Sequence, residues 1–332
     1  MALLDEIIAQ PRATPPFDPH MDPEYFFHDE HGYLSAWQSL ARHAALKAWH
    51  LAETIGPEAG AEYLARAWPL TGLYQDSPLL ISLFVRLGVE RRLHDAARNL
   101  SQGLPIPPEA AALRRLAEVI GSWRFPSALS TAMEAERFLL VSAAKSDDSW
   151  QRAISYPSTL ETDISMTALV ENGLSREMDS RRIAAGFWKL FHTLVQAAKD
   201  LEADMQNPRG WAECQKTVMY IRKGRMRDKK SIEALSGSGY GLFVVELSPP
   251  LLNSFDTVLE AESRRRLTVF GLHLWADLIE RNPVDREPPL NPLTGEPMII
   301  EREEGHVIVR SGLREDDPHA EEWAMVIDIG WL

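Results

Sequence analysis

The spacing of hydrophobic residues along the chain is typical of a mainly helical protein. In the first long segment, apolar residues recur every three or four positions, which places them on one face of a helix. This stripe consists of Trp37, Leu40, Ala44, Ala48, Leu51 and Ile55. The pair Gly56 and Pro57 then predicts the end of this helix and the start of the next one.

The same spacing predicts further helices. Short breaks rich in Pro, Gly or Ser separate the helices before residue 145, whereas the stretch 146–175 has no clean period. The expected ranges of these helices are 58–74, 78–100, 108–121, 127–145, 176–204 and 250–281. The stripe of the helix over 176–204 consists of Ile183, Phe187, Leu190, Phe191, Leu194 and Ala198. Short connections favour antiparallel neighbours, so we expect a multi-helix, antiparallel, bundle-like body.

The two ends of the chain depart from this helical pattern. Residues 11–24 contain five prolines, which lack an amide proton and restrict the preceding residue, so we expect an extended N-terminal arm over residues 1–30. Short β-branched runs at 298–300 and 307–309 predict a hairpin, and 325–329 a third strand. The predicted organisation is therefore mainly α: this arm, a helical body over 31–248, and a long helix with a small antiparallel β-sheet over 249–332.

Composition and charge restrict the function classes. A chain of 332 residues buries roughly three quarters of its extended surface and needs no disulfide or metal to form a core. The formal net charge of −13 argues against a basic surface for nucleic acid, and no nucleic-acid partner is expected. Cys214 is the single cysteine, so no intrachain disulfide can form. No run approaches 18 apolar residues, so no transmembrane span is expected.

The C-terminal end contains three motifs that resemble the major pseudopilin of type II secretion systems. The text NPLTGEP over 291–297 is similar to its DP-x-G-x-P segment, and SGLREDD over 311–317 to its S-x-G-x-D loop. The terminal DIGW over 328–331 is similar to its D-I-x-x-W ending. The chain departs from the pseudopilin pattern in three ways. Asn291 stands where the motif has Asp, and the serine-glycine loop is shorter. The sequence also lacks the hydrophobic N-terminal helix that filament assembly needs.

A wider resemblance connects the chain to uncharacterised bacterial envelope proteins that are common in planctomycetes. It rests on SPLLISLFVR over 77–86 and on RRRLT over 264–268, which precedes the same kind of tail. This resemblance implies an exported, often membrane-anchored protein without an assigned activity. The resemblance favours the periplasm or the cell envelope as the location of the protein. The apolar N-terminal segment is too short and too acidic to be a signal peptide, so the cytoplasm is expected if no export signal is missing.

An acidic loop near the C-terminus suggests a candidate ion site. In calcium-binding pseudopilins the loop before the final strand supplies oxygen ligands, and Asp316 and Asp317 match that loop, with Asp328 close in sequence. Calcium takes six to eight oxygen ligands, which carboxylates and loop carbonyls can provide. The resemblance therefore makes these three residues candidate calcium ligands, against the alternative of a solvated acidic turn. No other cofactor is expected.

Two further clusters support alternative functions. His20, His28 and His31 lie among acidic residues, and this mixture suits the zinc of a metal-dependent hydrolase, although the sequence contains no HExxH motif. The stretch RKGRMRDKK over 222–230 holds six basic side chains and would suit an adaptor for an anionic partner. Each cluster is also explained by solvation alone: a polar surface arm in the first case and a wet loop in the second.

No catalytic constellation is recognisable in the sequence. SGSGYG over 236–241 matches neither dinucleotide-binding nor P-loop motifs, and no GxSxG elbow is present. With the C-terminal resemblance, this favours a non-enzymatic helical scaffold or binding protein of the bacterial cell envelope, acting through a protein partner. The metal-dependent hydrolase and the anionic-partner adaptor remain the alternatives.

Overall fold

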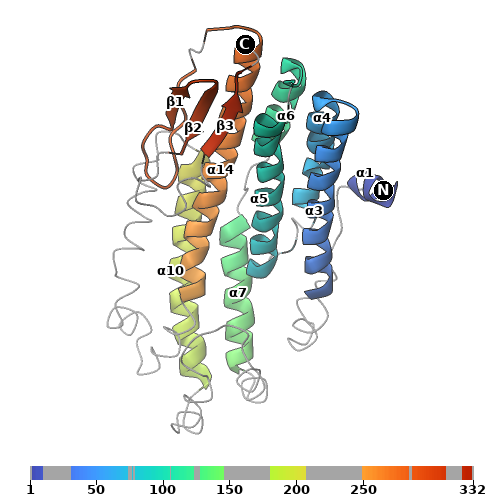
Figure 1. Cartoon of the computed structure of the whole chain (residues 1–332). Helices are drawn as coiled ribbons and strands as arrows, with labels where there is room; N and C mark the ends of the chain where they lie inside the picture. The colour runs from blue at the N-terminus through green and yellow to red at the C-terminus, as the bar shows by residue number, and fades with distance from the viewer. Residues whose placement is uncertain are drawn as a thin grey trace.

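The protein is mainly helical with a small antiparallel β-sheet at its C-terminal end, which confirms the predicted fold class. The computed structural model describes residues 2–9, 31–73, 77, 79–104, 106–122, 128–145, 180–206, 249–283, 286–311 and 324–330. Within these residues the long helices run alongside one another, and the sheet lies beside one end of the last helix (Figure 1).

The described elements follow the predicted order. The helices are α1 (Ala2–Ala9), α3 (His31–Thr54), α4 (Pro57–Ala67), the 3-10 turn η1 (Trp68–Gly72), α5 (Leu80–Gly103), α6 (Ala110–Ser122), α7 (Ala128–Lys145), α10 (Ser180–Gln206) and α14 (Pro249–Ile279). The strands are β1 (Ile299–Glu303), β2 (His306–Arg310) and β3 (Ala324–Asp328).

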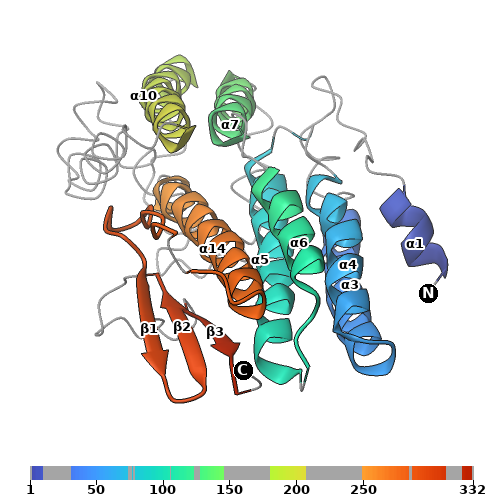
Figure 2. The same ribbon diagram turned by 90° about the horizontal axis from the view of Figure 1, so that it is seen from above.

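The helix α14, like α5, contributes to both of the main hydrophobic cores. Its first part, with Phe255 and Leu259, packs with α7, α10 and the beginning of α5. Its second part, with Leu267 and Leu274, packs with α3, α4, α6, the end of α5 and the sheet. Seen from above, α14 lies between the sheet and the pair α7 and α10, with α5 and α6 beside it (Figure 2). The long helix is thus built into the helical body.

The sheet forms at the β-branched runs from which it was predicted. β1 pairs antiparallel with β2, β2 pairs antiparallel with β3, and Gly305, with a φ of 81°, lies in the tight turn between the first two strands. Val307 and Val309 of β2 and Met325 and Ile327 of β3 are buried in the core that contains the second part of α14. The predicted hairpin and third strand are confirmed.

The first described residues differ from the expected extended arm, because Ala2–Ala9 form the helix α1. Leu4, Ile7 and Ile8 pack on the core beside α3 and α4, and Lys47 of α3 binds the Asp5 carboxylate at 2.7 Å. Spacings of three and four residues put the apolar side chains on one helical face. Tertiary contact therefore makes this segment helical ahead of the prolines, and the remainder of the arm lies outside the described residues.

The helices α3 and α4 approach each other closely at Gly60, and this contact makes a direct prediction. A Cβ at Gly60 would lie 2.7 Å from the Ala52 Cβ and 2.8 Å from the backbone oxygen of Ala48. Because backbone atoms cannot move aside as a flexible side chain can, we expect Gly60→Ala to lower the free energy of unfolding by about 1–3 kcal/mol. Urea denaturation followed by tryptophan fluorescence measures this loss.

Gly88 in the interior of α5 provides the matched control. A Cβ there would have its nearest neighbour at 3.7 Å, which is ordinary contact. Replacing a helical glycine with alanine without a clash stabilises by about 0.5–1 kcal/mol. We therefore expect Gly88→Ala to stabilise the protein, and equal effects of the two substitutions would contradict the close approach at Gly60.

Candidate functional site

The candidate calcium ligands are only partly within the described residues. Asp316 and Asp317 lie outside them. Asp328 ends β3, where its Oδ1 accepts a hydrogen bond of 2.9 Å from the backbone N–H of Gly330. Within the described ranges, no group of three or more His, Cys, Asp or Glu side chains is arranged to hold a metal ion. The calcium site stays a prediction that rests on the resemblance.

The two alternative clusters stay predictions as well. His20 and His28 and the basic stretch 222–230 lie outside the described residues, and His31 is the first residue of α3. The structure therefore tests neither cluster.

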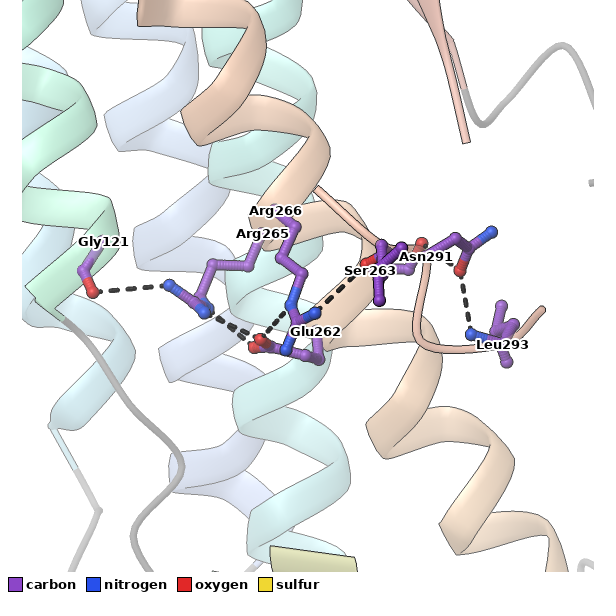
Figure 3. A network of polar contacts seen from close by, with 8 residues as sticks. Gly121, Glu262, Ser263, Arg265, Arg266, Asn291 and Leu293 are labelled. Atoms are coloured by element: carbon purple, nitrogen blue, oxygen red, sulfur yellow. Dashed lines mark hydrogen bonds and ion pairs between the residues drawn. The ribbon is translucent and has the colours of Figure 1, made fainter. Parts of the chain in front are cut away.

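The arginine triplet 264–266 divides its side chains between two environments, as expected for consecutive residues of a helix. Arg265 donates two hydrogen bonds of 2.7 Å to the Glu262 carboxylate, and Arg266 donates another of 2.7 Å (Figure 3). Arg265 also donates to the carbonyl of Gly121 in α6, at 3.4 Å. The Arg264 side chain instead lines a cleft together with residues of α5.

Glu262, Arg265 and Arg266 belong to a polar belt that also includes Arg86 and Glu90 of α5, whose side chains pair at 3.0 Å. The belt lies between the two hydrophobic cores, because α14 enters one core before residue 262 and the other after residue 266. Burial alone would raise the pKa of Glu262, but the two neighbouring arginines outweigh it and lower that pKa. Burial raises the pKa of Glu90 despite its pairing with Arg86.

Asn291 anchors the segment between α14 and the sheet to the same part of α14. Its Oδ1 accepts hydrogen bonds from the Ser263 hydroxyl at 3.1 Å and from the Leu293 N–H at 2.8 Å (Figure 3). Its Nδ2 donates to the carbonyl of Ser311. The side chain is fully buried, so each of these contacts replaces a lost contact with water. Asn291 is thus a structural residue of the predicted NPLTGEP motif.

A polar cleft beside the belt is the strongest candidate for a functional site. It is bounded by α5, α14 and the start of β3, and its volume is about 410 Å³. The helix α5 contributes Arg91, Asp95, Arg98, Asn99 and Gln102. Because these positions are separated by four, three, one and three residues, they occupy one face of the helix. Arg264 of α14 and Ala324 of β3 complete the lining.

The cleft has a buried floor and an open rim. Arg264 is 8% exposed and Ala324 is 9% exposed, whereas the side chain of Arg91 at the rim is 50% exposed. Arg98 joins the elements, since it binds the Asp95 carboxylate and donates a hydrogen bond of 3.3 Å to the Ala324 carbonyl. One turn further along α5, the Ser101 hydroxyl donates to the Val326 carbonyl at 2.6 Å. These bonds fix β3 against α5.

The charges of the cleft are predominantly positive. Of the lining residues that the structure describes, three are arginines and one is an aspartate, so their formal charge is +2 in a protein whose net charge is −13. Burial, followed by the charge of Arg91, lowers the pKa of the Arg264 guanidinium, while Asp95 and Glu260 act in the opposite direction. Arginine remains protonated in proteins, so the cleft concentrates positive charge at a partly desolvated site.

Our sequence predictions missed this cleft, although one signal for it was present. The polar residues at 91, 95, 98, 99 and 102 form a stripe beside the apolar stripe of α5, and such stripes are usually solvated faces. What distinguishes this one is that Arg264 and Ala324, far along the chain, cover part of it. That coverage depends on tertiary structure.

None of the described helices combines the length and hydrophobicity that crossing a membrane requires. Comparisons of the chain with protein-family models, with curated proteins and with solved structures find no match.

Proposed function

We propose that the protein is a non-enzymatic helical binding protein that holds a small anionic ligand in the cleft between α5, α14 and β3. The observation that carries the proposal is the convergence of Arg91, Arg98 and Arg264 from two helices on one cavity. Guanidinium groups bind carboxylates and phosphates through charge-assisted hydrogen bonds, which are about twice as strong as neutral ones. A cavity of about 410 Å³ lies within the usual range for small-molecule sites.

The composition of the lining favours binding over catalysis. The lining side chains that the structure describes are arginine, amide, alanine and one aspartate, and none of these is a serine, cysteine, lysine or histidine that could act as a nucleophile. The Asp95 carboxylate is engaged by Arg98 and lies 4.0 Å from Arg91. The expected location in the cell envelope and the expected protein partner rest on the C-terminal resemblance and stay predictions.

Thermal unfolding and calorimetric titration with inorganic phosphate and with citrate test the proposal, with NaCl of equal ionic strength as the reference. A ligand present at ten times its Kd adds about 1.4 kcal/mol to the free energy of unfolding, so we expect a clear increase in Tm beyond the NaCl reference. Arg264→Gln and Arg91→Gln should each weaken binding roughly tenfold or more, because each removes a charge-assisted hydrogen bond. Asp95→Asn should tighten it, because a competing negative charge is removed.

The matched control is Arg42→Gln on α3, an exposed arginine on an element that contributes nothing to the cleft. It should leave binding unchanged. Arg91 is half-exposed, so Arg91→Gln reports on binding even where Arg264→Gln impairs folding. The proposal fails if phosphate and citrate raise Tm no more than NaCl does, or if Arg42→Gln weakens binding as much as the cleft variants.

A further inference from the structure

The positions of the three arginines around the cleft bear on the shape of the anion. Arg91 and Arg98 lie two turns apart on α5, and Arg264 lies on α14. A planar carboxylate has two oxygens, which a single guanidinium fork can match. A tetrahedral phosphoryl group has three terminal oxygens that point in different directions, and it carries a charge of about −1.5 to −2 at pH 7. Three guanidiniums and a lining charge of +2 suit the phosphoryl group better.

The other lining residues indicate what kind of molecule carries the phosphoryl group. Asn99 and Gln102 place two side-chain amides on the same face of α5, and each amide can donate to and accept from a hydroxyl group. Among the described residues, the lining includes no aromatic side chain on which a nucleobase could stack, and Ala324 is the one apolar member. The cavity also exceeds what a single phosphate ion fills, since it lies in the size range of sites for whole small molecules.

We infer that the ligand is a phosphate monoester of a small, hydroxyl-rich molecule such as a sugar or polyol. The three arginines hold the phosphoryl group, and Asn99 and Gln102 bind hydroxyl groups of the sugar or polyol. This inference rests on the proposed function and narrows it to one class of ligand.

Calorimetric titration with glucose 6-phosphate, inorganic phosphate, glucose and AMP tests the inference. We expect glucose 6-phosphate to bind about tenfold more tightly than inorganic phosphate, because hydroxyl contacts add to the phosphoryl contacts. Glucose should not bind detectably at the same concentrations, and AMP should bind no more tightly than inorganic phosphate. Asn99→Ala and Gln102→Ala should lower the affinity for glucose 6-phosphate toward that for inorganic phosphate, while leaving the latter unchanged.

Both substitutions lie at exposed helical positions, where alanine is well tolerated. Gln196→Ala, at an exposed glutamine of α10 outside the cleft, is the control and should change neither affinity. If glucose 6-phosphate and inorganic phosphate bind equally, or if AMP binds as tightly as the sugar phosphate, the ligand class is wrong while the anion-binding function stands. If no phosphate compound binds and the arginine variants change nothing, both fail.

A phospholipid headgroup is the other source of a phosphoryl group next to hydroxyls, and a separate measurement distinguishes it. Vesicles of phosphatidylglycerol present a phosphodiester, which carries a single charge. We expect them not to compete with glucose 6-phosphate. Competition that Arg264→Gln abolishes would overturn the inference of a soluble monoester.

Discussion

Replacing Glu262 with alanine should destabilise the protein by about 3 kcal/mol at neutral pH. The Glu262 side chain is buried and binds Arg265 and Arg266 with three hydrogen bonds of 2.7 Å. Its removal leaves two cations beside hydrophobic cores without their anion, and breaking a buried ion pair on one side costs about 3–5 kcal/mol. We expect the lower end of this energy range because water partly reaches the two arginine side chains, which are 19% and 17% exposed. Urea denaturation of the purified full chain measures the loss.

The pH dependence of this loss gives a second measurement. The folded protein lowers the pKa of Glu262, so the group contributes stability above its unfolded pKa, and this contribution is lost as the pH falls through the folded value. The difference between the wild type and Glu262→Ala should therefore be full at pH 7 and shrink in acid below the ordinary range of a glutamate. Glu62→Ala, at an exposed position of α4, should change stability by no more than about 0.5 kcal/mol. A pH-independent loss would contradict the ion-pair explanation.

The position of the belt explains why charged residues occur within such a helix. α14 enters one core at Phe255 and the other at Leu267, with Glu262, Arg265 and Arg266 between them. A displacement of α14 by one turn would move these side chains into apolar surroundings, where unpaired charges are unfavourable. The belt therefore specifies the register of α14 against α5 and α6. This same register brings Arg264 to the cleft.

Most of the fold was predictable because helical and strand periodicities are local properties of the sequence. The stripe over 183–198 is confirmed, since Phe187, Phe191 and Leu194 are all buried in one core. The exceptions are residues whose environment depends on distant elements. Ile55 was placed on the first stripe, yet it lies just beyond α3 and is 73% exposed. Trp188 lies within a helical pattern but faces outward, and Arg137 of α7 stacks on its ring.

The candidate site was not predictable, because its geometry depends on contacts between distant parts of the chain. Arg98 and Ala324 are 226 residues apart in sequence and are joined by a hydrogen bond. No local pattern indicates that α5 presents its polar stripe to β3 and to Arg264. Consecutive helical residues point in different directions, so the sequence is compatible with a division of the arginines 264–266 between environments. It could not assign one of them to a cleft and two to an ion-pair belt.

Replacing Asn291 with aspartate should destabilise the protein by about 3 kcal/mol at pH 7, and the loss should depend on pH. The motif that residues 291–297 resemble has Asp at this position. Here the Nδ2 of Asn291 donates to the Ser311 carbonyl inside a fully buried site, and an ionised carboxylate has no proton to donate. The substitution would thus bury a charge and set it against a carbonyl oxygen.

The sign of the pH effect follows from burial, which raises the pKa of the introduced carboxyl in the folded state. The variant is therefore most stable below the pKa that this carboxyl has in the unfolded chain, and it loses stability as the pH rises through the pKa that the carboxyl has in the folded protein. We expect Asn291→Asp to recover much of its stability between pH 7 and pH 5, because the protonated acid can donate its O–H to Ser311. Gln196→Glu, at an exposed position of α10 outside the cleft, should change stability little at either pH. If Asn291→Asp is as stable as the wild type at pH 7, the carboxylate is accommodated, and Asn291 is not held by its donation to Ser311.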